Sequence, residues 1–556
     1  MKTKKLISLV MVIALVITCL AACGGTTTGG ETQAAATKAT EAAATEATEA
    51  AEVVTAEAVD PGTTSAKRET INVGIEADVT NWDPWASGSS GRNDCLCNVY
   101  QNLIDYDPLV GQFNCVLAKS WTKSDDNMSY DVELWDNIVD SEGNEITAED
   151  VEHSLACAAE IATDLKDIVM EIKDDYNFTF TFVDDDGKTQ RKIEVGEEKR
   201  FCFYIVDSKY DAAALAAKPI GTGAYKFEAQ ESGYSITLVA NENYWQTDDQ
   251  REHIRDRQNV EKITFYVIPE SAQRTTALQN GTIDLCAYIS ADDLDKFEGN
   301  GFWIYEYPHN LSMEMWCNCD ETSPCNDLNL RLAVNYAVDA NVVLASVYNG
   351  KGKVLYDQCP DWQIGYNSDW ESQDNYYTNP SLDTAKEYLD KSKYAGETLK
   401  IICNTTSACV NTAQIVLSLL GQIGVNAEIC SYESSVYSEY IQDPANWDIM
   451  VNTRPASAGY LANGWESDMA SYRQPWGGTI NFVFDDDFQE MLATVLKMDT
   501  STEENFNKLH DYMIENAYSK GLVNYNVSVV VPDYITDVAL SYRKTVVPGG
   551  CTYTAE

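Results

Sequence analysis

Residues 218–245 read KPIGTGAYKFEAQESGYSITLVANENYW and contain two closely spaced glycines, Gly221 and Gly223. A dinucleotide-binding loop needs a third glycine and then a helix, but Lys226 occupies the third position and the next residues alternate as in strands. The Gly-Lys-Ser/Thr ending of a P-loop is also missing. The pattern therefore predicts a β-hairpin and no nucleotide site, with both glycines permitting backbone angles closed to other residues.

The N-terminus has the pattern of an export signal. Three lysines precede a nearly continuous apolar run, residues 6–20, which has about the length of a signal-peptide core. The run ends in Leu-Ala-Ala-Cys, which resembles the lipobox of bacterial lipoproteins. We therefore expect residues 1–22 to be a lipoprotein signal peptide and Cys23 to carry the acyl chains that anchor the protein. An ordinary signal peptide with a chance cysteine is the alternative.

The composition of the rest of the chain limits its number of domains and its possible partners. Residues 23–68 are rich in Gly, Thr, Ala and Glu and contain no aromatic residue, so we expect a tether without a core. The remaining residues are enough for two or three domains. The formal net charge of −48 argues against nucleic acid or an anionic membrane surface as a partner.

The cysteines and histidines give little support for a metal or a catalytic site. An exported protein with 16 cysteines favours disulfides, but free buried thiols are the alternative because the spacings show no framework. Cys95-Leu-Cys97 and Cys317-Asn-Cys319 lack the Cys-x2-Cys spacing of a zinc knuckle. The chain has four histidines and neither Gly-x-Ser-x-Gly nor His-Glu-x-x-His. We therefore expect no metal, no cofactor and no catalytic residue.

The body alternates strand and helix patterns. Thr147 with Asp150 predicts a capped helix start. A strand at 263–267, a helix at 271–279 and a strand from 283 form one strand-helix-strand unit. Residues 311–524 repeat this alternation, which predicts a second α/β region with its own core.

Six segments occur in the order and at the spacings of one protein family. They are NVYQNLIDYDP (98–108), LAKSWTKSDDNMSYDVEL (117–134), EITAEDVEHSL (145–155), PIGTGAYKF with ITLVANENYW (219–245), RTTALQNGTIDL (274–285) and LRLAVNYAVDANVVL (330–344). The chain resembles the large extracellular solute-binding proteins of peptide-type ABC transporters, often called family 5.

The resemblance implies an α/β fold of the two-lobe, periplasmic-binding-protein-like class (type II, cluster C-like) with an extra inserted domain in lobe one. Lobe one is expected to comprise residues 69–115, 216–305 and 525–556. The inserted domain is expected at 116–215 and lobe two at 306–524. In this family the ligand binds in the cleft between the lobes, which close about hinge strands.

The resemblance also implies a lipid-anchored extracellular protein that captures a solute, usually a peptide in this family, and passes it to an ABC transporter permease. No bond would be made or broken. We expect a monomer on the outer face of the cytoplasmic membrane, which is the periplasm if the source has an outer membrane. An oligosaccharide or other non-peptide solute, and a surface signalling receptor on the same fold, remain alternatives.

Peptide-binding members carry an acidic residue in lobe two that pairs with the peptide's ammonium group. The corresponding stretch here, residues 446–465, places Ser457 at that position with Arg454 nearby. Because a buried ammonium without a partner is costly, Arg454 is a candidate to grip a ligand carboxylate instead. Capping a loop or pairing with a surface acid is the alternative role for Arg454. The expected ligand contacts, including aromatic platforms, are Trp82, Trp447, Asn452, Arg454, Ser457, Tyr460 and Trp465.

Overall fold

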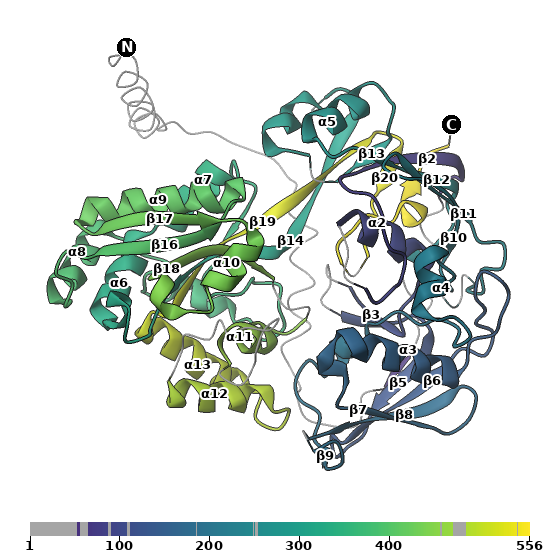
Figure 1. Ribbon diagram of the computed structural model, residues 1–556, viewed down its shortest axis with the longest axis horizontal. Coiled ribbons are helices and arrows are strands. Elements are labelled where there is room, and N and C mark those ends of the chain that lie inside the picture. Colours follow the sequence, from purple (N-terminus) through teal and green to yellow (C-terminus); the bar gives the residue numbers. More distant parts are fainter. Residues whose placement is uncertain are drawn as a thin grey trace, which may run out of the picture. The chain divides into compact units, whose positions relative to one another are not determined.

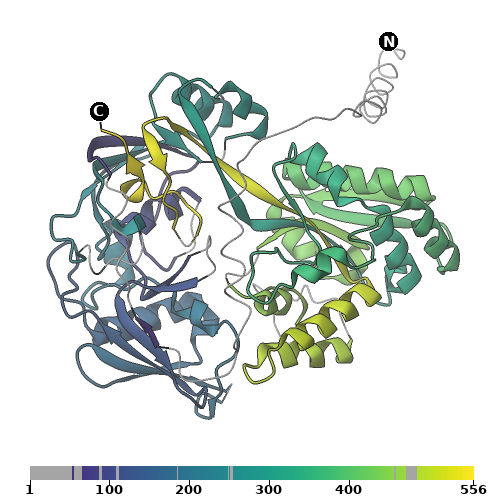
Figure 2. The ribbon, with the colours of Figure 1, turned by 180° about the vertical axis from the view of Figure 1, so that it is seen from behind.

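Two long antiparallel strands, β14 (Phe302–Cys317) and β19 (Ser519–Pro532), connect the two halves of the fold (Figures 1 and 2). We call them the hinge strands. This computed structural model describes residues 53–55, 65–86, 90–107, 112–184, 186–247, 250, 254–287, 289–297, 299–455, 459–470, 485–541 and 543–555. Residues 51–556 form one compact unit.

The hinge strands lie in the middle of an 11-stranded sheet with the order β10-β11-β12-β2-β13-β19-β14-β18-β16-β17, and β15 pairs with β19. The lobe-one strands are β2 (Arg68–Ile75), β10 (Tyr225–Glu231), β11 (Ser235–Ala240), β12 (Val260–Val267) and β13 (Leu285–Cys286). The lobe-two strands are β15 (Gly352–Val354), β16 (Thr398–Asn404), β17 (Asn426–Tyr432) and β18 (Ile449–Pro455).

Lobe one packs its strands against α2 (Ser90–Val99) and the C-terminal segment, and Ile71, Ile263 and Val529 lie in its core. Its smaller elements are α4 (Ala212–Ala217), α5 (Ser271–Gln279), the hairpin β3 (Ile104–Asp107) and β4 (Gln112–Cys115), and the pair β20 (Ile535–Asp537) and β21 (Thr552–Tyr553).

The predicted inserted domain has its own antiparallel sheet and core. The sheet contains β5 (Ala118–Lys123), β6 (Ser129–Leu134), β7 (Ile168–Ile172), β8 (Asn177–Val183) and β9 (Gln190–Arg191). Strand β1 (Val53–Thr55), from the segment expected to be a tether, pairs with β5 at the edge of this sheet. Helix α3 (Ala148–Ile161) buries Val151 and Leu155 in this core. Thr147 and Asp150 form the predicted capping box at its start.

Lobe two places helices against its part of the large sheet. Its helices are α6 (Leu328–Ala337), α7 (Ala340–Val347), α8 (Leu382–Lys391), α9 (Ser407–Ile423), α10 (Ser434–Tyr440), α11 (Leu461–Met469), α12 (Asp486–Leu496) and α13 (Glu503–Asn516). One core forms where α6, α7 and α9 meet β14, β16 and β18, and a second core forms around α11 to α13.

The structure confirms the hairpin but corrects the reason for its glycines. Strands β10 and β11 pair antiparallel as predicted. Neither Gly221 nor Gly223 has a left-handed backbone angle, so that expectation was wrong. A Cβ at Gly221 would lie 2.4 Å from the carbonyl oxygen of Val99, and one at Gly223 would lie 2.5 Å from that of Asn98. The glycines are needed because the backbone at the end of α2 passes so closely.

The fourteen cysteines in the described residues are all free thiols. No single helix in the described part of the chain is long and apolar enough to cross a membrane, and the bent pair α6 and α7 meets that criterion only when the two are taken together. Cys23 and Ser457 lie outside the described residues.

Candidate ligand-binding cleft

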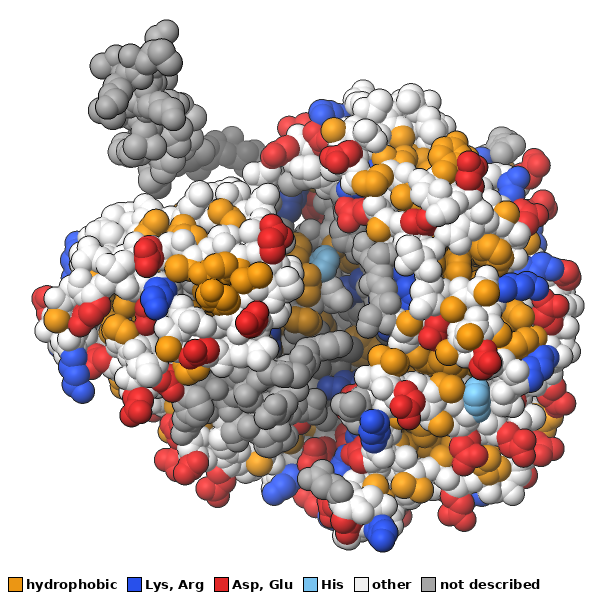
Figure 3. Space-filling view, viewed as in Figure 1, with side chains coloured by type: hydrophobic (Ala, Val, Ile, Leu, Met, Phe, Trp, Pro, Cys, Tyr) orange, Lys and Arg blue, Asp and Glu red, His pale blue; other side chains and the backbone are white. Residues whose placement is uncertain are grey.

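A hollow separates the two lobes in the space-filling view (Figure 3). The hinge strands join the lobes in antiparallel pairing that is irregular at two places: a bulge at residues 309–311, which we call the hinge bulge, and a one-residue shift between Met313 and Glu314. In that hinge bulge, residues 309–311 lie between the pairs Pro308–Asn526 and Ser312–Asn524, opposite Tyr525 alone. An irregularity of this kind bends a strand locally. The bulge is therefore the natural place for the lobes to rotate against each other.

One side-chain amide holds the hinge bulge in shape. The Nδ2 group of Asn524 donates hydrogen bonds to the carbonyl oxygens of His309 at 2.9 Å and Leu311 at 3.0 Å. Its Oδ1 atom accepts a hydrogen bond from the indole of Trp362 at 3.2 Å. The backbone N–H of Leu311 donates to Nδ1 of His309 at 2.9 Å. This last bond requires an unprotonated Nδ1, and burial lowers the pKa of His309 to about 4, with a smaller effect from Lys544.

A buried cation links the lobes beside this bulge. Lys544, near the C-terminus, is 4% exposed and donates from Nζ to the carbonyl oxygen of Pro308 at 2.8 Å. Its ammonium lies 4.1 Å from the ring centroid of Trp362, which belongs to lobe two. Burial lowers the pKa of Lys544 to about 8. Lys544 thus places a buried amino group beside the hinge bulge, although the chain as a whole is strongly acidic.

The end of β18 lies beside the hinge strand β14. Asn452 is buried, and its Oδ1 atom accepts hydrogen bonds from Nδ2 of Asn404 at 2.8 Å and from the thiol of Cys409 at 3.2 Å. Arg454 pairs in register with Ser312 of the hinge bulge. Two of the predicted ligand contacts therefore lie close to the hinge, on the strand that pairs with β14.

An aromatic contact joins the lobes at the β3–β4 hairpin. The ring of Tyr460 is stacked on Phe113 with centroids 6.5 Å apart, and Phe113 contacts Tyr106 at 5.1 Å. Gly459 has a left-handed φ of +89°, and a Cβ there would lie 3.5 Å from both lobe-one rings. Tyr460 is thus the predicted aromatic residue that meets the opposite lobe.

The three predicted tryptophan contacts are buried within the lobes. Their indole N–H groups donate to protein acceptors: Trp82 to Oε1 of Gln230 at 3.0 Å, Trp447 to the carbonyl of Ile441 at 3.1 Å and Trp465 to Oδ1 of Asp357 at 3.0 Å. In this structure they pack the cores. Their role as ligand contacts stays a prediction.

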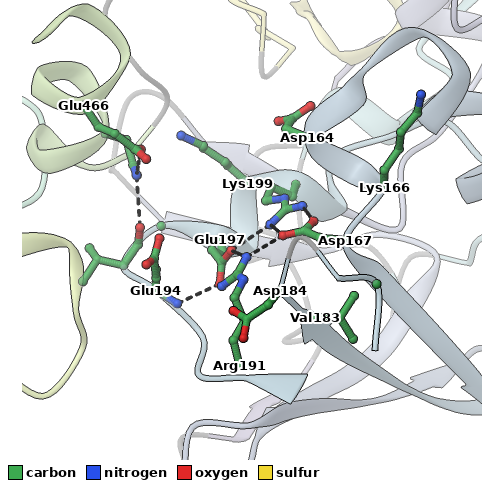
Figure 4. A pocket seen from close by; sticks show the side chains of 15 residues that line it. Asp164, Lys166, Asp167, Val183, Asp184, Arg191, Glu194, Glu197, Lys199 and Glu466 are labelled. Atoms are coloured by element: carbon green, nitrogen blue, oxygen red, sulfur yellow. Dashed lines mark hydrogen bonds and ion pairs between the residues drawn. The ribbon is translucent and has the colours of Figure 1, made fainter. Parts of the chain in front are cut away.

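A second concave region lies at the inserted domain. A charged cavity of about 560 Å³ is lined by inserted-domain residues together with Asn463 and Glu466 of α11 (Figure 4). Arg191 and Arg200 pair there with acids: Arg191 with Asp167 at 2.7 Å and Arg200 with Glu197 at 2.7 Å. Within the described part of the chain, no group of three or more His, Cys, Asp or Glu side chains could hold a metal ion.

Comparison with known proteins decides the family. The model of the bacterial extracellular solute-binding proteins, family 5 middle region, matches residues 112–476. The chain belongs to this family. The expected α/β, two-lobe fold is confirmed by solved structures: HbpA2 from Haemophilus parasuis has a TM-score of 0.74 at 17% identity and covers 88% of this chain and 100% of its own.

Among the curated relatives of this family 5 protein, heme-binding protein A of Haemophilus influenzae is 24% identical over 372 residues, covering 61% of this chain and 65% of the relative. The probable D,D-dipeptide-binding periplasmic protein DdpA of Escherichia coli is 24% identical over 322 residues, covering 54% of this chain and 59% of the relative. The match thus spans less than two thirds of each relative's length.

Sequence patterns could not identify Phe113, Trp362 or Lys544 as inter-lobe residues. Lys544 donates a hydrogen bond to Pro308, which is 236 positions away in the sequence, and no local motif predicts a contact between residues so far apart. Phe113 lies in β4, and its sequence neighbours give no indication of its contact with Tyr460.

Proposed function

We propose that this family 5 protein captures a solute between lobe one and lobe two and delivers it to an ABC importer. The observation that carries the proposal is the pair of hinge strands, interrupted by the hinge bulge, joining two lobes that each have their own core. Such a joint allows a ligand that contacts both lobes to shift the population towards a closed state.

The ligand we propose is a peptide or a similar solute that carries a carboxylate. The relatives differ in what their names say they bind, heme in one and a D,D-dipeptide in the other, so the family alone leaves the ligand open. A carboxylate is favoured by two cations beside the hinge strands, Arg454 on β18 and Lys544 in the C-terminal segment. Asn452, Ser457 and Tyr460 are the further contacts we propose on lobe two.

A thermal-shift screen of the full chain against peptide pools, sugars and amino-acid derivatives tests this proposal. A ligand at one hundred times its Kd stabilises the folded state by about 2.7 kcal/mol, which raises the melting temperature measurably. We expect carboxylate-bearing peptides to give the largest shift and Arg454→Gln to reduce it. Absence of a shift from every peptide pool would rule out the peptide version, and a shift from sugars would favour the oligosaccharide alternative.

We further propose that solute capture involves no chemistry and that the protein is a monomer anchored outside the cell through Cys23. Mass spectrometry should recover the bound solute unchanged. Cys23→Ala should move the protein from the membrane fraction to the soluble fraction, because several acyl chains are needed for stable anchoring. A Cys23→Ala variant that stays with the membrane would contradict the anchor.

A further inference from the structure

One segment of the inserted domain contacts lobe two through its backbone. We call residues 192–197 the strap. The backbone N–H of Val195 donates to the carbonyl oxygen of Leu496, at the end of α12, at 2.8 Å. Glu194 and Lys497 form an antiparallel bridge next to it. The strap therefore pairs with lobe two as a short piece of β-structure.

Side chains add to this pairing from both flanks. The Nδ2 group of Asn463 on α11 donates to the carbonyl oxygen of Val195 at 3.1 Å. Lys192 forms an ion pair with Asp499 at 2.7 Å, and Nδ2 of Asn127 donates to the same carboxylate at 3.4 Å. Both partners of the ion pair are more than half exposed, so water competes for it. The contact is polar and small, which suits a joint that opens and closes.

A glycine allows the strap to come this close. Gly196 has a left-handed φ of +77°, and a Cβ there would lie 1.9 Å from Oδ1 of Asn463 and 2.9 Å from the ring of Tyr460. A side chain at this position would have to displace the amide of Asn463, which donates to Val195. Figure 4 shows the neighbouring strap residues Glu194 and Glu197 on the inserted domain and Glu466 on α11.

We propose that the strap is a latch that holds the inserted domain on lobe two in the arrangement seen here, in part of the ligand-free molecules, and stabilises that arrangement without any contact to the ligand. The consequence for capture rests on the proposed function: ligand affinity rises with the fraction of molecules in the binding-competent state. The inserted domain then influences how readily the lobes close, in addition to being an insertion in lobe one.

The test compares two glycines of the inserted domain in the full chain without ligand. Gly196→Ala introduces the clash with Asn463. Gly187→Ala is the matched control, because Gly187 has a similar φ of +67° and no atom within 4 Å of its would-be Cβ. The readout is hydrogen exchange of the Val195 amide, resolved by fragmentation mass spectrometry, with the radius of gyration from X-ray scattering. Exchange at Val132, inside the inserted-domain sheet, reports whether that domain stays folded.

We expect Gly196→Ala to speed exchange at Val195 by at least about tenfold and to raise the radius of gyration, with Val132 unchanged. Gly187→Ala should match the wild type. Equal behaviour of the two variants, or an unprotected Val195 amide in the wild type, would overturn the latch.

A second pair of variants keeps the test decisive if Gly196→Ala does not fold. Lys192→Glu should also speed exchange at Val195, and adding Asp499→Lys should restore protection by reversing the ion pair. No change in Lys192→Glu, or no rescue in the double variant, would overturn the latch. The latch test uses no ligand, so a ligand screen without hits does not affect its result. An unprotected Val195 amide would likewise contradict the latch alone and would not contradict solute capture.

Discussion

Replacing Asn524 by alanine tests the hinge most sharply. The side chain makes three hydrogen bonds of 2.9 to 3.2 Å, two given to carbonyl oxygens of the bulge and one accepted from Trp362, and a longer one of 3.4 Å to Oγ of Ser312. Each bond contributes about 1 kcal/mol net, and a buried group left without a partner costs about 1–3 kcal/mol. Asn524→Ala should therefore lower the free energy of unfolding by about 3 kcal/mol.

Urea unfolding followed by tryptophan fluorescence measures this loss. Asn300→Ala is the control, because Asn300 is an exposed residue whose amide makes one hydrogen bond to Lys296. We expect the control to change stability by less than about 0.5 kcal/mol, as is usual for surface substitutions. A loss in Asn524→Ala no larger than in the control would refute the claim that this amide shapes the bulge.

Three further sets of substitutions test the hinge bulge, the aromatic contact between the lobes and a buried lysine of β19. Burial lowers the pKa of His309 to about 4, so the unfolded chain is protonated at a higher pH than the folded chain, and the free energy of unfolding falls as the pH drops from about 6.5 to 4. His309→Asn should remove up to about 3 kcal/mol of that pH dependence in urea titrations. Wild-type and variant plots of stability against pH that run parallel would contradict this prediction. A double-mutant cycle of Phe113→Ala and Tyr460→Ala should give a coupling of about 0.5–1.5 kcal/mol, whereas strict additivity would show that the rings do not interact. Lys520→Met should lower the free energy of unfolding by about 3 kcal/mol or more at pH 6 in urea unfolding, because the buried ammonium donates to three backbone carbonyls. A variant more stable than the wild type would show that the cost of burying the charge exceeds the gain from those hydrogen bonds.

Local signals in the sequence predicted most of the elements. The capping box of Thr147 and Asp150 depends on two residues that are only three positions apart in the chain. The prediction for Gly221 and Gly223 placed the hairpin correctly but gave the wrong reason. The close approach of α2 depends on tertiary packing, which a glycine pattern alone does not reveal.

The candidate cleft was harder to predict for the same reason. Trp82, Trp447 and Trp465 follow loop patterns in the sequence, yet the structure buries them in the lobes. Lys544 and Phe113 reach the inter-lobe region because distant segments converge there. Hydrophobic periodicity reports which side chains are buried locally, but it carries no information about which buried or half-buried residues face another lobe.

The boundaries expected for the lobes and the inserted domain stay predictions. The described residues contain separate hydrophobic cores on either side of the hinge strands and within residues 103–245. Limited proteolysis that releases the inserted domain at its edges, near residues 116 and 215, would test them directly.

Closure of the two lobes on a solute is the central claim, and X-ray scattering tests it most directly. The radius of gyration of the full chain should be measured with and without a saturating amount of the best compound from the thermal-shift screen. We predict a smaller radius with the compound, because contacts to both lobes favour the closed state. An unchanged radius with a compound that stabilises the protein would contradict solute capture by closure.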